Sequence, residues 1–318
     1  MPRSCAALLL TAPLLVGLAG CASPVGNGTR PGNAVASDSA PVRDGVMTPV
    51  ERSQLRERAI EELERQAFAE WALLRANAME GLSEAPTRAA GVIRAGLADD
   101  NEGVRAIAAM LAGETRLSGS APSLRAMLTD PSPLVRIGAI AGLAMMGERV
   151  DQSPLAAMLE HERQDVRRQA AFALGEIGNP SAIPMLRSAA RGKAGTAPGS
   201  AGAIFRMQAA EAIHKLGETE VVNTLRAGLY PSSVEEMEAA VIACQILGEI
   251  GDQGAVKQLV EIVEFERSGG GGRIDYLYPP ELRLAAATAL VKLGHTPRGE
   301  VGPAFEESSQ PTVRAQVA

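Results

Sequence analysis

The sequence predicts an all-α fold: a right-handed α-solenoid of stacked helical hairpins with an N-terminal capping helix. One observation is the pattern V-R-R-Q-A-A-F-A-L-G-E-I-G at 166–178, whose apolar residues recur three and four positions apart, the spacing of one helix face. Another is that this pattern returns along most of the chain. Composition agrees, because aromatic residues make up only 3% of the 318 residues, as expected where small side chains pack between closely spaced helices.

The copies of the pattern align on one anchor residue, which an arginine follows in all copies but one. The anchors are Val104, Val135, Val166, Phe205, Ala239 and Leu282. Every copy after the first has a glycine at the same offset from its anchor, at Gly147, Gly178, Gly217, Gly251 and Gly294. Because glycine readily adopts the left-handed conformation that ends a helix, this offset predicts a repeated helix of constant length.

A second amphipathic helix is predicted between successive anchors, for example at 120–129, 154–160, 182–190 and 253–266. Two helices in each unit, stacked on those of the neighbouring units, make a helical-hairpin solenoid. The pattern V-R-x-x-A-A-x-A-L-G-x-I-G resembles that of HEAT repeats, particularly the short HEAT-like type also found in phycobilisome lyases. The resemblance covers residues 85–294 and implies the solenoid fold, while it leaves the function open.

Residues 1–20 are predicted to be a bacterial lipoprotein signal peptide. Arg3 precedes an apolar run at 6–19 that is too short to span a bilayer comfortably. The run ends in L-A-G-C at 18–21, which resembles a lipobox. The resemblance implies cleavage before Cys21 and a membrane anchor through lipid on Cys21, in the outer membrane of the cell envelope and facing the periplasm. The alternative is an ordinary secretory peptide with an incidental cysteine.

Residues 21–47 are predicted to be a disordered tether, because they are rich in Gly, Pro, Ser and Asn and lack an apolar period. A long helix is predicted over 48–82, beginning with the capping box T-P-V-E. Its apolar residues, Trp71 among them, form one continuous stripe, so we expect the helix to cover the open apolar side of the first repeat. The alternative is a coiled coil that joins two copies of the chain.

Two insertions lengthen the spacing between anchors, at 188–203 and at 267–280. Both fall between the first and second helices of their units, so both are expected to project from the same rim of the solenoid. The second insertion carries Arg273, Tyr276 and Tyr278, and these residue types are enriched at interface anchors. The three are candidate partner-binding residues. The alternative is a glycine loop whose tyrosines fold back on the last repeat.

The tail at 295–318 contains the start of a further repeat, because P-T-V-R-A at 311–315 repeats the anchor pattern at the expected spacing from Leu282. Either this segment is a short terminal cap, or the sequence is truncated relative to a longer solenoid.

The arginine after the anchor recurs at one position of the second helix, at Arg105, Arg136, Arg167, Arg206 and Arg283. Asp99 and Asp130 stand in the turns before two of these helices. We expect a structural arginine ladder, in which these side chains form ion pairs between stacked units. An anion-binding stripe is the functional alternative. His161 takes the place of the aspartate in the third unit.

Composition argues against several classes of function. The net charge of −6 disfavours nucleic-acid binding, which needs a basic surface. Three histidines and three cysteines leave little material for a metal or nucleophile site. Deoxyhypusine hydroxylases, which are HEAT-like enzymes, bind iron through several His-Glu pairs, whereas this chain has one, at His161-Glu162. Cys244 lies among apolar residues in a predicted helix and is expected to pack there as a small apolar side chain.

The sequence thus predicts a non-catalytic scaffold for protein–protein interaction, a HEAT-repeat lipoprotein that holds a protein or peptide partner near the membrane. We expect no catalytic residue, no metal, no cofactor and no small-molecule substrate. One alternative is an enzyme of the HEAT-like lyase type, which an envelope address disfavours because bilin lyases act on cytoplasmic phycobiliproteins. The other is a structural lipoprotein that self-associates through the N-terminal helix.

Overall fold

The computed structural model describes residues 48–264, 266–268 and 274–295. Its fold is the predicted α-solenoid, to which a short β-hairpin is added. The second helices of successive units are α3 (Ala72–Leu82), α5 (Glu102–Glu114), α7 (Pro133–Met145), α9 (Gln164–Ile177), α11 (Ser200–Lys215), α13 (Met237–Glu249) and α15 (Pro280–Lys292). The first helices that alternate with them are α2 (Pro49–Gln66), α4 (Pro86–Gly96), α6 (Ala121–Met127), α8 (Pro154–Met158), α10 (Ile183–Arg191), α12 (Val222–Ala227) and α14 (Val256–Glu264).

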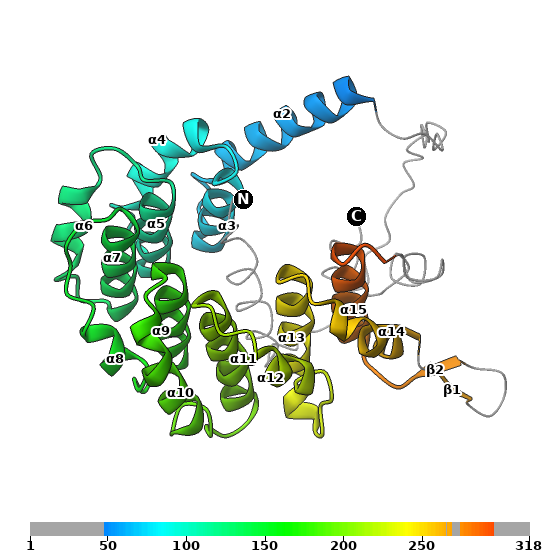
Figure 1. The fold of residues 1–318 in the computed structure, drawn as a ribbon. Helices are drawn as coiled ribbons and strands as arrows, with labels where there is room; N and C mark the ends of the chain where they lie inside the picture. Colours follow the sequence, from blue (N-terminus) through cyan, green and yellow to red (C-terminus); the bar gives the residue numbers. More distant parts are fainter. Residues whose placement is uncertain (1–47, 265, 269–273, 296–318) are drawn as a thin grey trace, which may run out of the picture.

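The second helices form a continuous inner row. Each packs on the second helix of the next unit, from α3 on α5 to α13 on α15, and Figure 1 shows them side by side along an arch, with α4, α6, α8 and α10 on its outer side. Their apolar side chains fill the core, where Leu82, Leu143 and Phe205 are fully buried. Burial of such side chains stabilises the stack by roughly 25 cal/mol for each Å² removed from water.

The glycine that follows a second helix has the predicted role. Gly178 has a φ of 76° and caps α9 in the left-handed conformation. The glycines at the same offset beyond α7, α11, α13 and α15 also have positive φ. Since a side chain would be strained there, backbone geometry sets where each second helix ends.

Helices α5 and α7 approach closely because glycines face each other. A Cβ atom on Gly113 would lie 2.3 Å from the Cα atom of Gly142, and one on Gly138 would lie 2.5 Å from the carbonyl oxygen of Ala106. Any larger residue at these positions would therefore push the two helix backbones apart.

The small residues of α7 also let α5 and α9 touch across it. The side-chain amide of Gln169 on α9 lies against the sulfur of Met110 on α5. Arg163, just before α9, pairs with Glu102 of α5 at 2.9 Å. Three successive units are thus tied together on the inner side of the arch.

The single helix predicted over 48–82 is divided in two. The predicted capping box is present at Thr48, but α2 stops at Gln66 and α3 starts only at Ala72. The cause is a turn closed by Arg75, whose Nη1 donates to the carbonyl oxygens of two turn residues at 3.0 and 2.8 Å. Sequence periodicity missed this break because the turn contains neither glycine nor proline.

Helices α2 and α3 therefore form a complete unit rather than one capping helix. α3 contributes Ala78, Met79 and Leu82 to the core, whereas α2 has no buried residue. Figure 1 shows α2 projecting beyond the first unit. Trp71 and Phe68, in the turn between them, are 71% and 67% exposed, so Trp71 does not seal the end of the core as the predicted stripe required.

Both insertions have structure of their own. In the first, the turn after α10 packs Ala194 into the core. The second contains two antiparallel strands, β1 (Glu266–Ser268) and β2 (Ile274–Tyr276), and residues 269–273 between them lie outside the described residues. Short 3-10 turns, η1 (Pro180–Ala182), η2 (Val234–Glu236) and η3 (Gln253–Ala255), lead into α10, α13 and α14.

Candidate functional site

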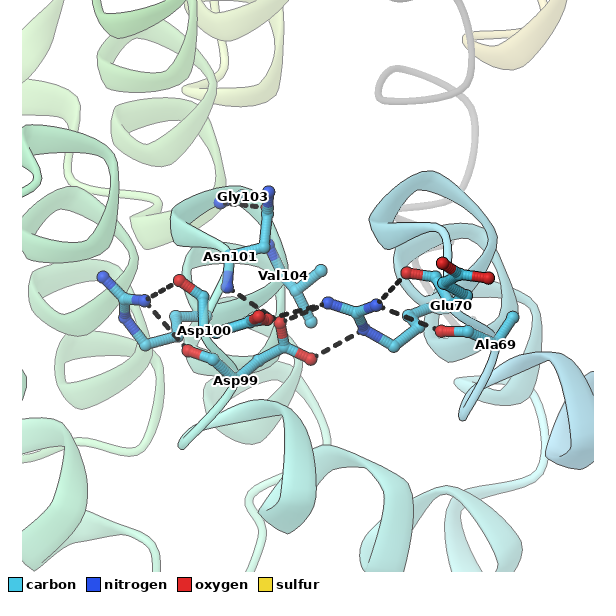
Figure 2. A network of polar contacts seen from close by, with 9 residues as sticks. Ala69, Glu70, Asp99, Asp100, Asn101, Gly103 and Val104 are labelled. Carbon is cyan, nitrogen blue, oxygen red and sulfur yellow. Dashed lines mark hydrogen bonds and ion pairs between the residues drawn. The ribbon is translucent and has the colours of Figure 1, made fainter.

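Two rungs of the arginine ladder join the first three units. Arg105 on α5 donates through Nε and Nη2 to both carboxylate oxygens of Asp130, at 3.1 and 3.2 Å. Arg75 on α3, which the sequence analysis missed, holds Asp99 in the same way at 2.8 and 2.6 Å. Each arginine also donates through Nη1 to two carbonyl oxygens of the turn before its own helix, and Figure 2 shows this network around Asp99 and Asp100.

The arginines fix the charge of these aspartates. Burial raises the pKa of Asp99, but hydrogen bonds from Arg75 and from the backbone N–H of Asn101 outweigh it, so the pKa lies below its ordinary value. The same balance, with Arg105 as the donor, lowers the pKa of Asp130. Both carboxylates are therefore ionised at neutral pH and hold neighbouring units together.

The other predicted ladder arginines bind backbone carbonyl groups instead. Arg136 and Arg167 donate to the turns before their own helices, Arg206 to the first insertion and Arg283 to α14. Among the described residues, no carboxylate is hydrogen-bonded to Arg136, Arg167 or Arg206. The reason is local: His161 stands where the next aspartate would be, and an insertion follows in the unit after it.

A second set of ion pairs, absent from the sequence analysis, links the first helix of a unit to the end of its second helix. The arginines lie on α6, α10 and α12, and the pairs are Arg125–Glu148, Arg187–Glu218 and Arg226–Asp252. Each acidic partner directly follows a repeat glycine. That dipeptide, glycine then acid, was the signal in the sequence that could have revealed the pairs.

The inner face carries a buried glutamate on α11 that has its own cation. Glu211 is 6% exposed, and its carboxylate lies 2.8 Å from Nζ of Lys215. The same ammonium group lies 2.6 Å from Glu176 of α9 and 5.0 Å from the ring centre of Phe172. Burial raises the pKa of Glu211, and Lys215 opposes that rise.

Glu80 stands at the same repeat position on α3 and has no such cation. It is 2% exposed, and both carboxyl oxygens are buried without a hydrogen-bond partner in the part of the chain that the structure describes. One turn further on, where α11 has Lys215, α3 is followed by Glu84. Burial first, and then the charge of Glu114 on α5, raise the pKa of Glu80 to about 8. The raised pKa favours the protonated form of Glu80 at neutral pH, with both carboxyl oxygens buried away from solvent.

Of the three candidate partner-binding residues, Tyr278 is the one whose side chain the structure describes. Tyr278 is half-buried and packs against the C-terminal core, as in the alternative in which the tyrosines fold back. Tyr276 lies in β2, opposite Glu266 of β1. Arg273 lies outside the described residues. The exposed apolar side chain beside them is Leu277, at 39%.

Cys244 and His161 have structural surroundings. Cys244 is fully buried in α13, and burial raises the pKa of its thiol. Nδ1 of His161 accepts a hydrogen bond from the backbone N–H of Arg163 at 3.1 Å, within the turn before α9. The described residues contain no group of three His, Cys, Asp or Glu side chains that could hold a metal ion.

Several predictions concern residues that the structure does not describe. Cys21, the signal peptide at 1–20, the tether at 21–47 and the tail at 296–318 lie outside the described residues. Among the helices that are described, none has the length and apolar character needed to cross a bilayer.

Comparison with known proteins identifies the repeats. The family model for HEAT repeats matches residues 90–164 and 152–243, which confirms the family predicted from the anchor pattern. A phycobilisome maturation protein from Synechococcus elongatus is 38% identical over 95 residues, which are 30% of this chain and 44% of the relative. The chain thus spans less than half the length of that curated relative.

Two solved structures share the fold loosely. The complex of CpcE and CpcF of phycocyanin lyase from Nostoc sp. PCC7120 gives a TM-score of 0.43 and 18% identity, over 89% of this chain and 97% of that chain. Human deoxyhypusine hydroxylase in complex with glycerol gives a TM-score of 0.38 and 18% identity, over 84% and 96%. Neither likeness is close enough to carry an argument about function.

The similarity to a maturation protein corrects the function predicted from the sequence. It contradicts a non-catalytic interaction scaffold and the expected lack of enzyme activity, and it favours the lyase-type alternative. The prediction failed because it looked for catalytic residues among the histidines and cysteines alone. Such a search does not register a carboxyl group such as Glu80, whose pKa burial raises to about 8.

Proposed function

This chain is a HEAT-repeat protein, and on that premise we propose that it is a maturation enzyme of the lyase type, which acts on another protein. The observation that carries the proposal is the 38% identity over 95 residues to the phycobilisome maturation protein. A helical solenoid offers a long concave surface on which a protein can lie. The partner in this proposal is therefore a protein substrate, held on the inner face of the arch.

A candidate proton donor for this reaction is Glu80, because its pKa is raised to about 8. A lyase makes or breaks a bond by addition to a double bond or by the reverse elimination, and both directions require proton transfer. A side chain is most effective as an acid when its pKa lies near the working pH, and that of Glu80 is about 8. Burial between α3 and α5, together with the charge of Glu114, keeps the proton on Glu80. Both carboxyl oxygens are buried, so the proposal requires α3 and α5 to separate before a substrate can take that proton.

The proposal includes an address in the cell envelope. After cleavage of residues 1–20, Cys21 is lipidated, and residues 21–47 tether the solenoid to the outer membrane on its periplasmic side. The L-A-G-C sequence at 18–21 supports this anchor. The substrate is then an envelope protein rather than a cytoplasmic one. Cys21→Ser should abolish incorporation of labelled palmitate and release the protein from the membrane fraction, and unchanged labelling would rule the anchor out.

The catalytic proposal is tested by intact-protein mass spectrometry of the envelope fraction. Cells that lack the gene are complemented with the full-length protein, with Glu80→Gln, or with Glu61→Gln, an exposed matched control on α2. At least one envelope protein should carry an added mass in cells with the wild-type or control protein. That adduct should be absent from the deletion strain and reduced about tenfold or more by Glu80→Gln, because an amide has no proton of suitable acidity.

Two outcomes would contradict the proposal in different ways. If all envelope proteins have the same masses with and without the gene, the chain is not a maturation enzyme. If cells with Glu80→Gln contain as much of the adduct as cells with the control variant, the chain is still a maturation enzyme but Glu80 is not its proton donor.

A further inference from the structure

A groove opens between α10, α11 and α12, away from the inner-face glutamates. It has a volume of about 390 Å³, and its lining includes Arg187, Arg191, Arg206, Ile213, Glu220 and Val221. A second groove of about 740 Å³ adjoins it along α10 and shares Arg187 and Arg191. The two grooves together form one open trough that follows α10.

Arg206 stands at the ladder position of its unit. In the first units, the edge formed by Nε and Nη2 of Arg75 and Arg105 binds both oxygens of an aspartate from the next unit. Arg206 keeps the other half of this arrangement, since its Nη1 donates to the carbonyl oxygen of Gly195 at 2.5 Å. Among the described residues no carboxylate is hydrogen-bonded to its remaining edge, while Glu236 of η2 interacts electrostatically with Arg206. The groove lies on the side of the next unit, where α12 begins.

The charges and the floor of the groove define the ligand that fits. Arg206 is half-buried and Arg191 is exposed, whereas Arg187 is already paired with Glu218. Val221 is half-buried and Ile213 is 3% exposed, so they form a small apolar floor beside the arginines. Because a guanidinium group prefers the two oxygens of a carboxylate, an acidic ligand with apolar flanks is complementary to both parts of the groove.

We propose that this trough binds a protein segment in which acidic and apolar side chains alternate. One carboxylate takes the place beside Arg206 that Asp130 takes beside Arg105, a second meets Arg191, and an apolar side chain lies on Ile213. A peptide segment is favoured over a small organic acid because two open grooves continue along α10 and share their arginines. The proposal does not depend on the lyase activity, since it concerns a different surface.

The test measures fluorescence anisotropy of a labelled hexapeptide of alternating leucine and glutamate, titrated with the purified full-length protein. Binding should be saturable, about tenfold or more weaker for the same peptide with glutamine in place of glutamate, and weaker at high salt. Arg206→Ala and Arg191→Ala should each weaken binding about tenfold, the loss expected for one charge-assisted hydrogen bond. Glu220→Gln should tighten it about twofold, because it removes a like charge from the groove.

Matched variants separate binding from folding. Arg206 also holds the first insertion through Gly195, so Arg191→Ala, at an exposed position, tests the site if Arg206→Ala perturbs the fold. Arg94→Ala removes an exposed arginine on α4 and should leave binding unchanged.

Four results would each overturn the proposal: no saturable binding, equal binding of the glutamate and glutamine peptides, no effect of Arg191→Ala, or displacement of the labelled peptide by hexanoate as effective as by unlabelled peptide. The last result would show that the ligand is a free organic acid.

Discussion

The inner face holds a buried glutamate in the first unit and another at the same repeat position on α11, and the two have opposite neighbours. On α11, Glu211 lies 2.8 Å from Nζ of Lys215. On α3, the charge that acts on Glu80 is the carboxylate of Glu114. The repeat fixes the position of the side chain, whereas burial and the charges packed against it set its protonation state. Equivalent positions in a solenoid can therefore have different chemistry.

The largest expected difference lies in the pH dependence of stability. The pKa of Glu80 is about 8 in the folded protein, above the ~4.3 of an unfolded glutamate. Between these values the folded state binds a proton that the unfolded state has lost. The free energy of unfolding should therefore fall as the pH rises from about 4 to about 8, by up to about 4 kcal/mol through this group. Glu80→Gln should flatten that slope, measured by urea unfolding at about pH 5 and about pH 8.

The control for this measurement is Glu220→Gln, which removes an exposed carboxyl group and should keep the wild-type slope. If Glu80→Gln also has the wild-type slope of stability against pH, Glu80 is not the group that holds the proton, and the proposed difference between Glu80 and Glu211 is wrong.

The next largest effect on stability is expected when the cation is removed from α11. Lys215→Met leaves Glu211 buried beside Glu176 and should lower the free energy of unfolding by about 2 kcal/mol at neutral pH. This is less than for a fully buried pair because the side chain of Lys215 is 31% exposed. Chemical denaturation measures the loss. Lys257→Met, whose side chain is 89% exposed, should cost less than about 0.5 kcal/mol, and equal losses in both variants would contradict the assigned role.

The smallest of the three effects on stability is expected when a cation is introduced beside Glu80. Glu84→Lys places an ammonium group four residues after Glu80, in the turn that follows α3, whereas Lys215 lies within α11. The substitution should raise the free energy of unfolding by up to about 1 kcal/mol at neutral pH. It should also lower the pKa of Glu80 and weaken the pH slope. Glu61→Lys on exposed α2 is the control for the added charge. If Glu84→Lys leaves the slope of stability against pH unchanged, the residue at position 84 does not account for the different pKa behaviour of Glu80 and Glu211.

The repeat spacing predicted the second helices because it reports backbone geometry directly. The anchors from Val104 to Leu282 all lie on second helices, and the glycines at the fixed offset cap them. The break between α2 and α3 was missed because it arises from hydrogen bonds of Arg75 to the turn, not from a local breaker. Its signal was Arg75 itself, which stands about one repeat length before Arg105.

The site was less accessible from sequence because its chemistry depends on burial and on neighbours in other units. Nothing in the sequence around Glu80 distinguishes it from the exposed glutamates of α2, and its pKa depends on α5 lying beside α3. The sequence analysis also predicted the arginine ladder over more units than form it, for a similar reason. An arginine at the right position forms a rung only when the next unit supplies an aspartate, and His161 does not.

The contact between α5 and α9 across α7 has a mechanical consequence. A solenoid acts as a spring when each unit touches only its neighbours, because a load is then shared along the whole stack. Gln169 against Met110, and Arg163 with Glu102, join units that are not neighbours. We therefore expect the stretch from α5 to α9 to bend less under load than contacts between neighbouring units alone would allow.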